Sequence, residues 1–318
     1  MTNKFYPVRK KGKYAFINEQ GELITDFEFD FANIFGGFKI NGKFGAINTS
    51  GEIILEAKFD LLGGFFDGLA SVEIDGKCGF ITHKGDFVIS PQYYRTTDFK
   101  NGIASILETI TSSPKIIDNS GTIILAGEAD YGDYSEELIS CQSQENRKWG
   151  FIDIKGNSII PFMYLYTQSF SEGKAAVTPE FINKKPNKKK YPLSGFINRE
   201  NEMIIPPKFQ IAEGNFSEGL CVFWDNGNGY IDDKGEIVIP AQYLVGEQFS
   251  EGLAGVQLKK NEKWGFIDKN GTQVIKPKFS HISSFENGIA EVIVGELYEE
   301  YKYGYISKNG DYIWKPTR

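Results

Sequence analysis

Short apolar runs alternate with short polar turns along almost the whole chain. The clearest case is the segment 263–271, in which the apolar run 264–267 leads into the turn 268–271, Asp-Lys-Asn-Gly. A second apolar pair, Val274 and Ile275, follows directly. Two apolar runs joined by a turn of this composition are typical of a β-hairpin. The pattern therefore predicts antiparallel strands in this segment.

The same hairpin recurs at fixed offsets, which is the signature of a repeat protein. A glycine follows the aromatic position of the first strand, and a turn residue follows six residues later. The strand glycine is found at Gly45, Gly79, Gly150, Gly195, Gly229, Gly265 and Gly304, with Ala15 and Lys115 in two weaker copies. The turn residue is found at Gly21, Gly51, Gly85, Gly121, Gly156, Asn201, Gly235, Gly271 and Gly310. The spacing runs from 30 residues (Ala15 to Gly45) to 45 residues (Gly150 to Gly195).

Each turn has the composition of a type I turn followed by a left-handed residue. Asp, Asn, Ser or Thr stands three residues before the turn residue, where its oxygen can accept hydrogen bonds from backbone N–H groups. Glycine suits the left-handed position because it has no Cβ, and Asn201 is the next most tolerant choice. Such loops join hairpin strands and fix their register.

A third strand completes the repeating unit. A Phe-x-x-Gly turn follows each hairpin and precedes a Leu-Ala or Ile-Ala strand start. The turn phenylalanines are Phe65, Phe99, Phe170, Phe216, Phe249 and Phe285. We expect these rings to be buried between neighbouring units, each contributing about 1.5–3 kcal/mol. The predicted fold class is all-β, a tandem repeat of about nine three-stranded antiparallel units.

Two segments, 148–153 and 263–268, both read Lys-Trp-Gly-Phe-Ile-Asp and are followed by the same turn signals. They resemble the bacterial WG repeat family, also called KWG repeats, and the resemblance covers essentially all of the chain. The structural signature residues of these two copies are Trp149, Gly150, Gly156, Trp264, Gly265 and Gly271. The resemblance implies a β-rich array with a binding role and implies no catalytic residue.

We expect one array over residues 1–318. Its units are roughly 4–37, 38–68, 69–102, 103–137, 138–173, 174–219, 220–252, 253–288 and 289–318. The sixth unit carries a lysine-rich insertion, residues 178–192, which is either a solvated loop or a basic finger for an acidic partner. The candidate partner-binding residues there are Lys184, Lys185, Lys188, Lys189 and Lys190.

Composition narrows the function further. A net charge of −7 disfavours a nucleic-acid binder, which needs a basic face. The chain shows no signal peptide and no apolar run near the roughly 20 residues that span a bilayer, so we expect a cytoplasmic protein without membrane contact. Three dispersed cysteines, read as buried free thiols, and two histidines offer little for a metal site. We therefore expect no metal and no cofactor.

The carboxylates that recur at fixed offsets are interpreted as turn residues, because a catalytic pair needs one unique geometry. These are Asp153, Asp232, Asp268, Glu172, Glu218 and Glu251. No phosphate loop or nucleophile elbow occurs, so we expect no enzyme and identify no small-molecule substrate. The leading hypothesis is a binding scaffold that presents a repeated β surface to a protein partner. The alternative is a carbohydrate-binding or glycoside-active protein that uses exposed aromatic residues and a carboxylate pair.

The shape of the array follows from strand count. Propellers have four to eight blades of four strands, which nine units of three strands fit poorly. We therefore expect an open, curved superhelical array, with a closed propeller-like ring as the alternative. Small-angle X-ray scattering of the purified protein measures this directly. An open array gives an extended pair-distance distribution, and the compact profile of a ring would contradict the expectation.

Overall fold

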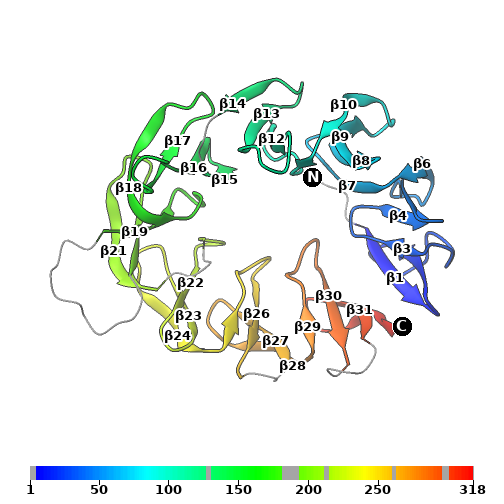
Figure 1. The fold of residues 1–318 in the computed structure, drawn as a ribbon. Coiled ribbons are helices and arrows are strands. Elements are labelled where there is room, and N and C mark those ends of the chain that lie inside the picture. The colour runs from blue at the N-terminus through cyan, green and yellow to red at the C-terminus, as the bar shows by residue number, and fades with distance from the viewer. Residues whose placement is uncertain are drawn as a thin grey trace. The chain divides into compact units, whose positions relative to one another are not determined.

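The computed structural model describes residues 5–126, 130–180, 193–210, 215–259, 263–295 and 301–317, and every regular element in them is a β-strand (Figure 1). The all-β prediction is confirmed. Consequently, none of the described residues forms a helix that could cross a membrane. The chain divides into two compact units, which are residues 1–128 with 313–318, and residues 129–312.

The first unit begins with fourteen strands. They are β1 (Tyr6–Lys10), β2 (Lys13–Ile17), β3 (Phe31–Ala32), β4 (Gly37–Ile40), β5 (Lys43–Ile47), β6 (Ile53–Phe59), β7 (Leu61–Phe66), β8 (Leu69–Ile74), β9 (Lys77–Thr82), β10 (Phe87–Tyr93), β11 (Arg95–Thr96), β12 (Ile103–Leu107), β13 (Lys115–Asp118) and β14 (Ile123–Ala126). Consecutive strands pair antiparallel within the sheets β1–β2, β3–β6, β7–β10 and β11–β14.

The remaining strands follow the same order, and the last of them, β32, passes into the first unit at Ile313. They are β15 (Asp130–Ser135), β16 (Leu138–Gln142), β17 (Trp149–Ile152), β18 (Ser158–Thr167), β19 (Ala175–Pro179), β20 (Ser194–Ile197), β21 (Met203–Phe209), β22 (Cys221–Trp224), β23 (Asn228–Ile231), β24 (Ile237–Tyr243), β25 (Val245–Gly246), β26 (Leu253–Gln257), β27 (Trp264–Asp268), β28 (Gln273–Phe279), β29 (His281–Ile282), β30 (Ile289–Val294), β31 (Lys302–Ser307) and β32 (Tyr312–Thr317). Their sheets are β15–β21, β22–β24, β25–β28 and β29–β32.

The prediction of three strands in each sheet is wrong for most of the described sheets. Five of them have four strands, because the connector after each hairpin adds a short strand at the edge. In β3, for example, Phe31 pairs with Lys39 and Ala32 pairs with Phe38. A strand of two residues carries no alternating pattern, so the sequence does not reveal it. The choice between an open array and a closed ring stays a prediction.

The turns are built as the sequence predicts. In the turn between β27 and β28, the Asp268 Oδ1 atom accepts hydrogen bonds from the backbone N–H groups of Asn270 (2.9 Å) and Thr272 (2.8 Å). The N–H of Gly271 donates to the Asp268 carbonyl at 2.9 Å, with a φ of +79°. Gly85 and Gly156 are left-handed as well. At the exceptional Asn201, the side-chain oxygen accepts a hydrogen bond of 2.6 Å from the Tyr164 hydroxyl.

The core lies between consecutive sheets and contains most of the Phe-x-x-Gly rings. Phe99, Phe170, Phe216, Phe249 and Phe285 are fully buried. Each packs against the aromatic residue that follows a strand glycine, as in the edge-on contact between Phe151 and Phe170, whose ring centroids lie 4.8 Å apart. The cluster around this pair takes residues from β16 to β20, which belong to two consecutive repeats. Phe65 differs because it is only partly buried.

The turn glycine also makes a contact between repeats, which a pair of substitutions can test. Gly51 and Gly12 have φ values of +84° and +82°. A Cβ on Gly51 would lie 2.3 Å from the Ile24 carbonyl oxygen of the preceding repeat, whereas one on Gly12 would meet nothing within 4 Å. Both replacements by alanine should cost about 1–2 kcal/mol of left-handed strain. We therefore expect Gly51→Ala to lower the melting temperature more than Gly12→Ala, and equal losses would contradict this packing role.

Candidate functional site

The lysine-rich candidates Lys184, Lys185, Lys188, Lys189 and Lys190 lie outside the described residues, and their role stays a prediction. The strands on either side are described. β19 extends to Pro179, so the first residues of the segment 178–192 are strand residues. The buried hydroxyls of Thr178 on β19 and Ser194 on β20 lie 2.7 Å apart and form a hydrogen bond. The strands on either side of the insertion, β19 and β20, therefore still pair as a hairpin.

The six signature residues lie in strands and turns, where each has a role in folding or packing. A Cβ on Gly150 or Gly265 would lie 2.5 or 2.6 Å from a carbonyl oxygen of the facing strand, so only glycine fits at either position. Gly156 and Gly271 hold left-handed turns. Trp149 packs against the core cluster, and Trp264 is part of one. These residues determine how the repeats fold and pack.

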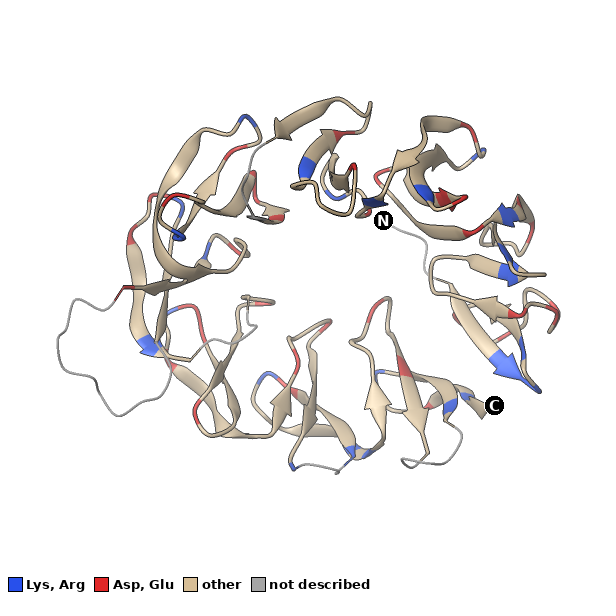
Figure 2. Cartoon of the chain, viewed as in Figure 1, with Lys and Arg blue, Asp and Glu red and all other residues tan. Residues whose placement is uncertain are grey.

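A hydrogen-bonded ladder joins the Phe-x-x-Gly turns of the second unit. Each serine hydroxyl donates to the phenylalanine carbonyl of the next turn, at 2.6–2.7 Å, and each glutamate accepts the N–H of the next turn glycine, at 2.8–3.1 Å. The serine rungs are Ser135–Phe170, Ser171–Phe216, Ser217–Phe249 and Ser250–Phe285. The glutamate rungs are Glu136–Gly173, Glu172–Gly219, Glu218–Gly252 and Glu251–Gly288. Figure 2 shows acidic residues at these turn tips.

The ladder refines the interpretation of the repeated carboxylates. Asp153, Asp232 and Asp268 accept backbone N–H groups of their own turns, as predicted. Glu172, Glu218 and Glu251 instead reach the neighbouring turn. Both sets make structural hydrogen bonds, the aspartates within a turn and the glutamates between neighbouring turns.

The first unit keeps one carboxylate rung and loses the serine. The carboxylate of Asp67 accepts the N–H of Gly102 at 2.8 Å. Phe66 and Lys100 stand where four turns of the second unit have serine, namely Ser135, Ser171, Ser217 and Ser250, and where the last turn has Glu286. The side chains of Phe66 and Lys100 cannot donate a hydroxyl to the next turn, and they lie at least partly in solvent. At these two positions, a residue that joins neighbouring turns is replaced by one whose side chain is at least partly exposed.

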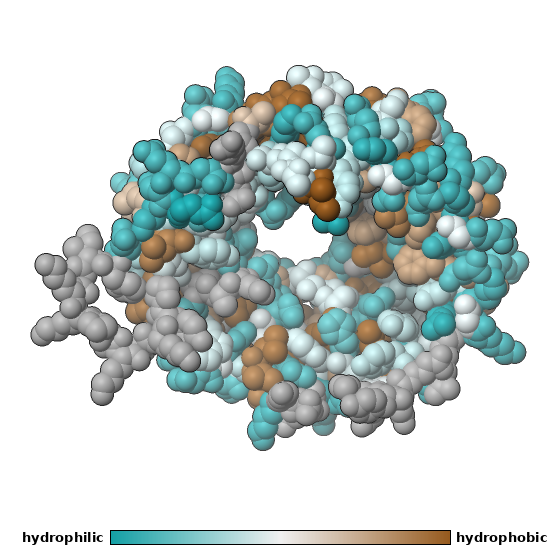
Figure 3. Space-filling model, in the orientation of Figure 1, coloured by the Kyte–Doolittle hydropathy of each residue, from teal (hydrophilic) through white to brown (hydrophobic). Residues whose placement is uncertain are grey.

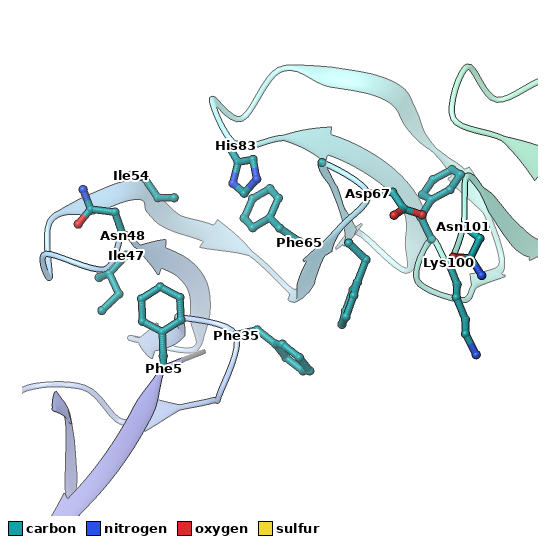
Figure 4. A pocket seen from close by; sticks show the side chains of 13 residues that line it. Phe5, Phe35, Ile47, Asn48, Ile54, Phe65, Asp67, His83, Lys100 and Asn101 are labelled. Atoms are coloured by element: carbon teal, nitrogen blue, oxygen red, sulfur yellow. The ribbon is translucent and has the colours of Figure 1, made fainter. Parts of the chain in front are cut away.

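A pocket of about 480 Å³ opens at these exchanged positions (Figure 4). It lies in the first unit and collects residues from the turns of three consecutive repeats. The apolar lining consists of Phe5, Phe35, Ile47, Ile54, Phe65, Phe66 and Phe99. The polar lining consists of Asn48, Asp67, His83, Lys100 and Asn101, with Gly68 between them. Its volume lies in the range of ligand-binding pockets, and its lining combines seven apolar with five polar residues.

Phe65 explains why the pocket forms in this repeat. Most other repeats place an aromatic residue after the strand glycine, but the second repeat has Ala46, which offers no ring. The Phe65 ring instead stacks on His83, with centroids 3.9 Å apart and an interplanar angle of 20°. Figure 4 shows this pair in the middle of the pocket, with Phe5 and Ile47 on one side and Asp67 and Lys100 on the other.

Exposed apolar residues outside the pocket are not by themselves a sign of binding. Most repeats expose one or two at the start of the outer strand, such as Phe87 and Val88 on β10. On the face shown in Figure 3, apolar residues form separate patches between hydrophilic residues. Scattered apolar residues are normal on protein surfaces. The pocket differs because its apolar residues converge on one hollow.

A second, smaller hollow of about 310 Å³ lies in the second unit. Trp224, at the end of β22, lines it with 39% of its surface exposed, and Phe223 and Val222 lie beside it. The polar lining consists of Asn228, Glu247, Gln248 and Ser284. An exposed indole ring beside a carboxylate and two amides is suited to a ligand with one apolar face and several hydroxyl groups.

Nucleophilic and metal chemistry have little support in the described residues. Cys141 and Cys221 are buried free thiols, and Cys78 is partly buried. Burial raises the pKa of the Cys221 thiol to about 12, so it stays protonated and unreactive. Within the described ranges, no three His, Cys, Asp or Glu side chains gather closely enough to hold a metal ion.

The sequence analysis assigned no residue of either hollow to a site. A signal was present in the second position of the Phe-x-x-Gly turns, which is serine at Ser171, Ser217 and Ser250 but Phe66 and Lys100 in the first unit. The contributions of Phe5 and Phe35 carry no repeat offset, so only the three-dimensional structure reveals them.

Comparison with known proteins agrees with the architecture. The WG containing repeat family matches residues 14–43, 44–78, 79–108, 149–178, 195–227, 229–263 and 264–298. No curated protein matches the sequence.

Solved structures are similar in fold. A crystal structure of a eukaryotic initiation factor has 10% sequence identity and a TM-score of 0.65, over 100% of this chain and 98% of that chain. Hsv2 of Kluyvelomyces marxianus has 9% identity and a TM-score of 0.44, over 71% of this chain and 85% of that chain. At these identities only the fold is compared, and the structural neighbours are β-propeller-like.

One ladder rung makes a pH-dependent contribution to stability. Burial raises the pKa of Glu218, but the hydrogen bonds from Lys269 and from the N–H of Gly252 outweigh it, so this pKa lies below its ordinary value of 4.5. A depressed folded pKa gives stability that is present above pH 4.5 and lost as pH falls through the folded pKa. Thermal unfolding from pH 7 to 3 should therefore show Glu218→Gln below the wild type at neutral pH, with the gap closing in acid. Glu145→Gln, at an exposed position, is the control, and a constant gap would contradict the assignment.

Proposed function

This chain belongs to the family of WG-containing repeat proteins, and from that premise we propose that it is a non-enzymatic scaffold that binds a protein partner. The observation that carries the proposal is the aromatic pocket of the first unit. It forms where Phe66 and Lys100 replace the serine that the second unit uses to join its turns.

The repeat fold holds the turn residues that form the binding surface in fixed positions. Within each unit, neighbouring repeats share a core and are joined at the turns, so the positions of the turn residues are held by the repeats on either side. In the first unit, the Asp67–Gly102 hydrogen bond joins two of the three turns that form the pocket. A pocket held in this way is largely preformed, which reduces the entropy lost on binding.

The lysine-rich segment is proposed as a second contact with the same partner. Its candidates are Lys184, Lys185, Lys188, Lys189 and Lys190, in a chain of net charge −7. An acidic partner would attract this basic segment, in competition with the acidic residues of the rest of the chain. No cofactor is part of this proposal.

Carbohydrate binding is the second candidate, and the Trp224 hollow is the observation that favours it. A glycan array probed with the wild-type protein and with Trp224→Ala separates the two functions. Binding that disappears in the variant supports this candidate, and a blank array with the wild type removes it.

The partner proposal predicts a specific loss of capture. Wild-type protein, chemically crosslinked in lysate of the native host, should capture a partner that is then identified by mass spectrometry. Replacing Phe66 and Lys100 together by serine restores the ladder residue, so we expect the fold to be kept and capture to fall at least tenfold. Replacing the five candidate lysines by glutamine should reduce capture and its dependence on salt.

The matched control for the lysine variant changes five exposed lysines elsewhere, Lys10, Lys77, Lys84, Lys234 and Lys308, to glutamine. This control carries the same change in net charge. If it reduces capture as much as the lysine-segment variant does, the contact reflects net charge alone. If neither the pocket variant nor the lysine variant changes capture, the scaffold proposal is wrong for these surfaces.

A further inference from the structure

We propose that the aromatic pocket of the first unit receives a tryptophan or tyrosine side chain of the partner, with the indole N–H or phenol O–H directed at Asp67. This inference rests on the proposed function, because it names the group that the scaffold recognises. It comes from three observations on the residues that line the pocket (Figure 4): five of them are phenylalanines, two of these rings meet edge to face, and one carboxylate lies among them.

Much of the pocket lining is aromatic. Five of the thirteen lining residues are phenylalanines, Phe5, Phe35, Phe65, Phe66 and Phe99. These rings offer no hydrogen bond, so a hydroxyl group placed against them would lose hydrogen bonds to water. The aromatic part of the lining therefore favours a guest with an apolar face.

The walls favour a flat, aromatic group. The rings of Phe35 and Phe66 meet edge to face, with centroids 5.2 Å apart. They lie directly on the backbone of Gly64, where a Cβ would come within 2.8 Å of either ring. Aromatic rings prefer offset or edge-on contacts with one another and gain about 0.5–1.5 kcal/mol beyond burial. A third ring can extend this arrangement, whereas an aliphatic side chain gains burial alone.

The rim determines the polar end of the guest. The Asp67 carboxylate, fixed by the Gly102 N–H at 2.8 Å, can only accept hydrogen bonds, so the group that reaches it must be a donor. Lys100 also lines the pocket, and its side chain extends away from Asp67 in Figure 4. The carboxylate therefore selects a donor, which among neutral aromatic side chains means the indole N–H or the phenol O–H.

The size of the pocket suits a side chain with the adjoining backbone. About 480 Å³ exceeds the space that one tryptophan needs, and the remaining rim carries the amides of Asn48 and Asn101. An amide side chain offers both donors and acceptors, as a peptide backbone does. The guest is thus the aromatic anchor of an extended segment.

Selection from a random peptide library displayed on phage tests this inference with the full-length protein. Wild type is the target, and Phe66→Ser serves as counter-target, with thermal unfolding as the check that it is folded. We expect enriched peptides to share Trp or Tyr at one position and to bind Phe66→Ser at least tenfold more weakly. Enrichment of Leu, Lys or Arg at that position, or equal binding to the variant, would overturn the proposal.

The role of Asp67 has its own readout. In fluorescence anisotropy, changing the anchor of a selected peptide from Tyr to Phe should weaken binding to the wild type several-fold, because the donor is lost. In Asp67→Leu this change should have no effect, and an unchanged Tyr preference would overturn the assignment of the donor. If the protein captures a partner from lysate but the selected peptides share no aromatic residue, the aromatic anchor is refuted and the scaffold function is not. If the selected peptides share Trp or Tyr but no partner is captured from lysate, the scaffold function is refuted and the aromatic anchor is not.

Discussion

The structure depends on the packing of each small sheet against the next. A sheet of three or four short strands has apolar residues on more than one side and cannot bury them alone, so its neighbours complete its core. The left-handed turn makes this packing close, because a residue without Cβ, such as Gly51, lets the turn rest on the carbonyl of Ile24 in the preceding repeat. The glycine that the turn conformation requires is therefore also the residue that allows neighbouring repeats to pack closely.

The second contact between repeats, the ladder of serine and glutamate side chains, explains where function can arise. In the second unit the turn positions are committed to hydrogen bonds, as in Ser217–Phe249 and Glu218–Gly252. In the first unit Phe66 and Lys100 are released from this role, and the aromatic pocket opens beside them. A repeat protein can thus gain a binding site by giving up a small number of joining residues while its core keeps the fold.

Both hollows form where one repeat departs from the residue types that the other repeats share. Ala46 removes a ring from the core of the second repeat, and Phe65 moves to a stack on His83. Trp224 places an exposed indole in a strand whose counterparts carry smaller side chains at that place, such as Gln257 in β26. Each change is small in the sequence, and each leaves the hydrogen-bonded sheet in place, since the strand partners use only backbone groups.

The amino-acid sequence determined the repeat, its period, the turns and the burial of the Phe-x-x-Gly rings, because these depend on contacts at fixed offsets along the chain. The tertiary structure decided the short fourth strand, the ladder between turns and the pocket. Asp67 meets Gly102, and Phe5, Phe35 and Phe99 come to line one hollow, only after separate repeats have packed. Such contacts join residues of different repeats that are far apart in the sequence, so no local sequence pattern predicts them.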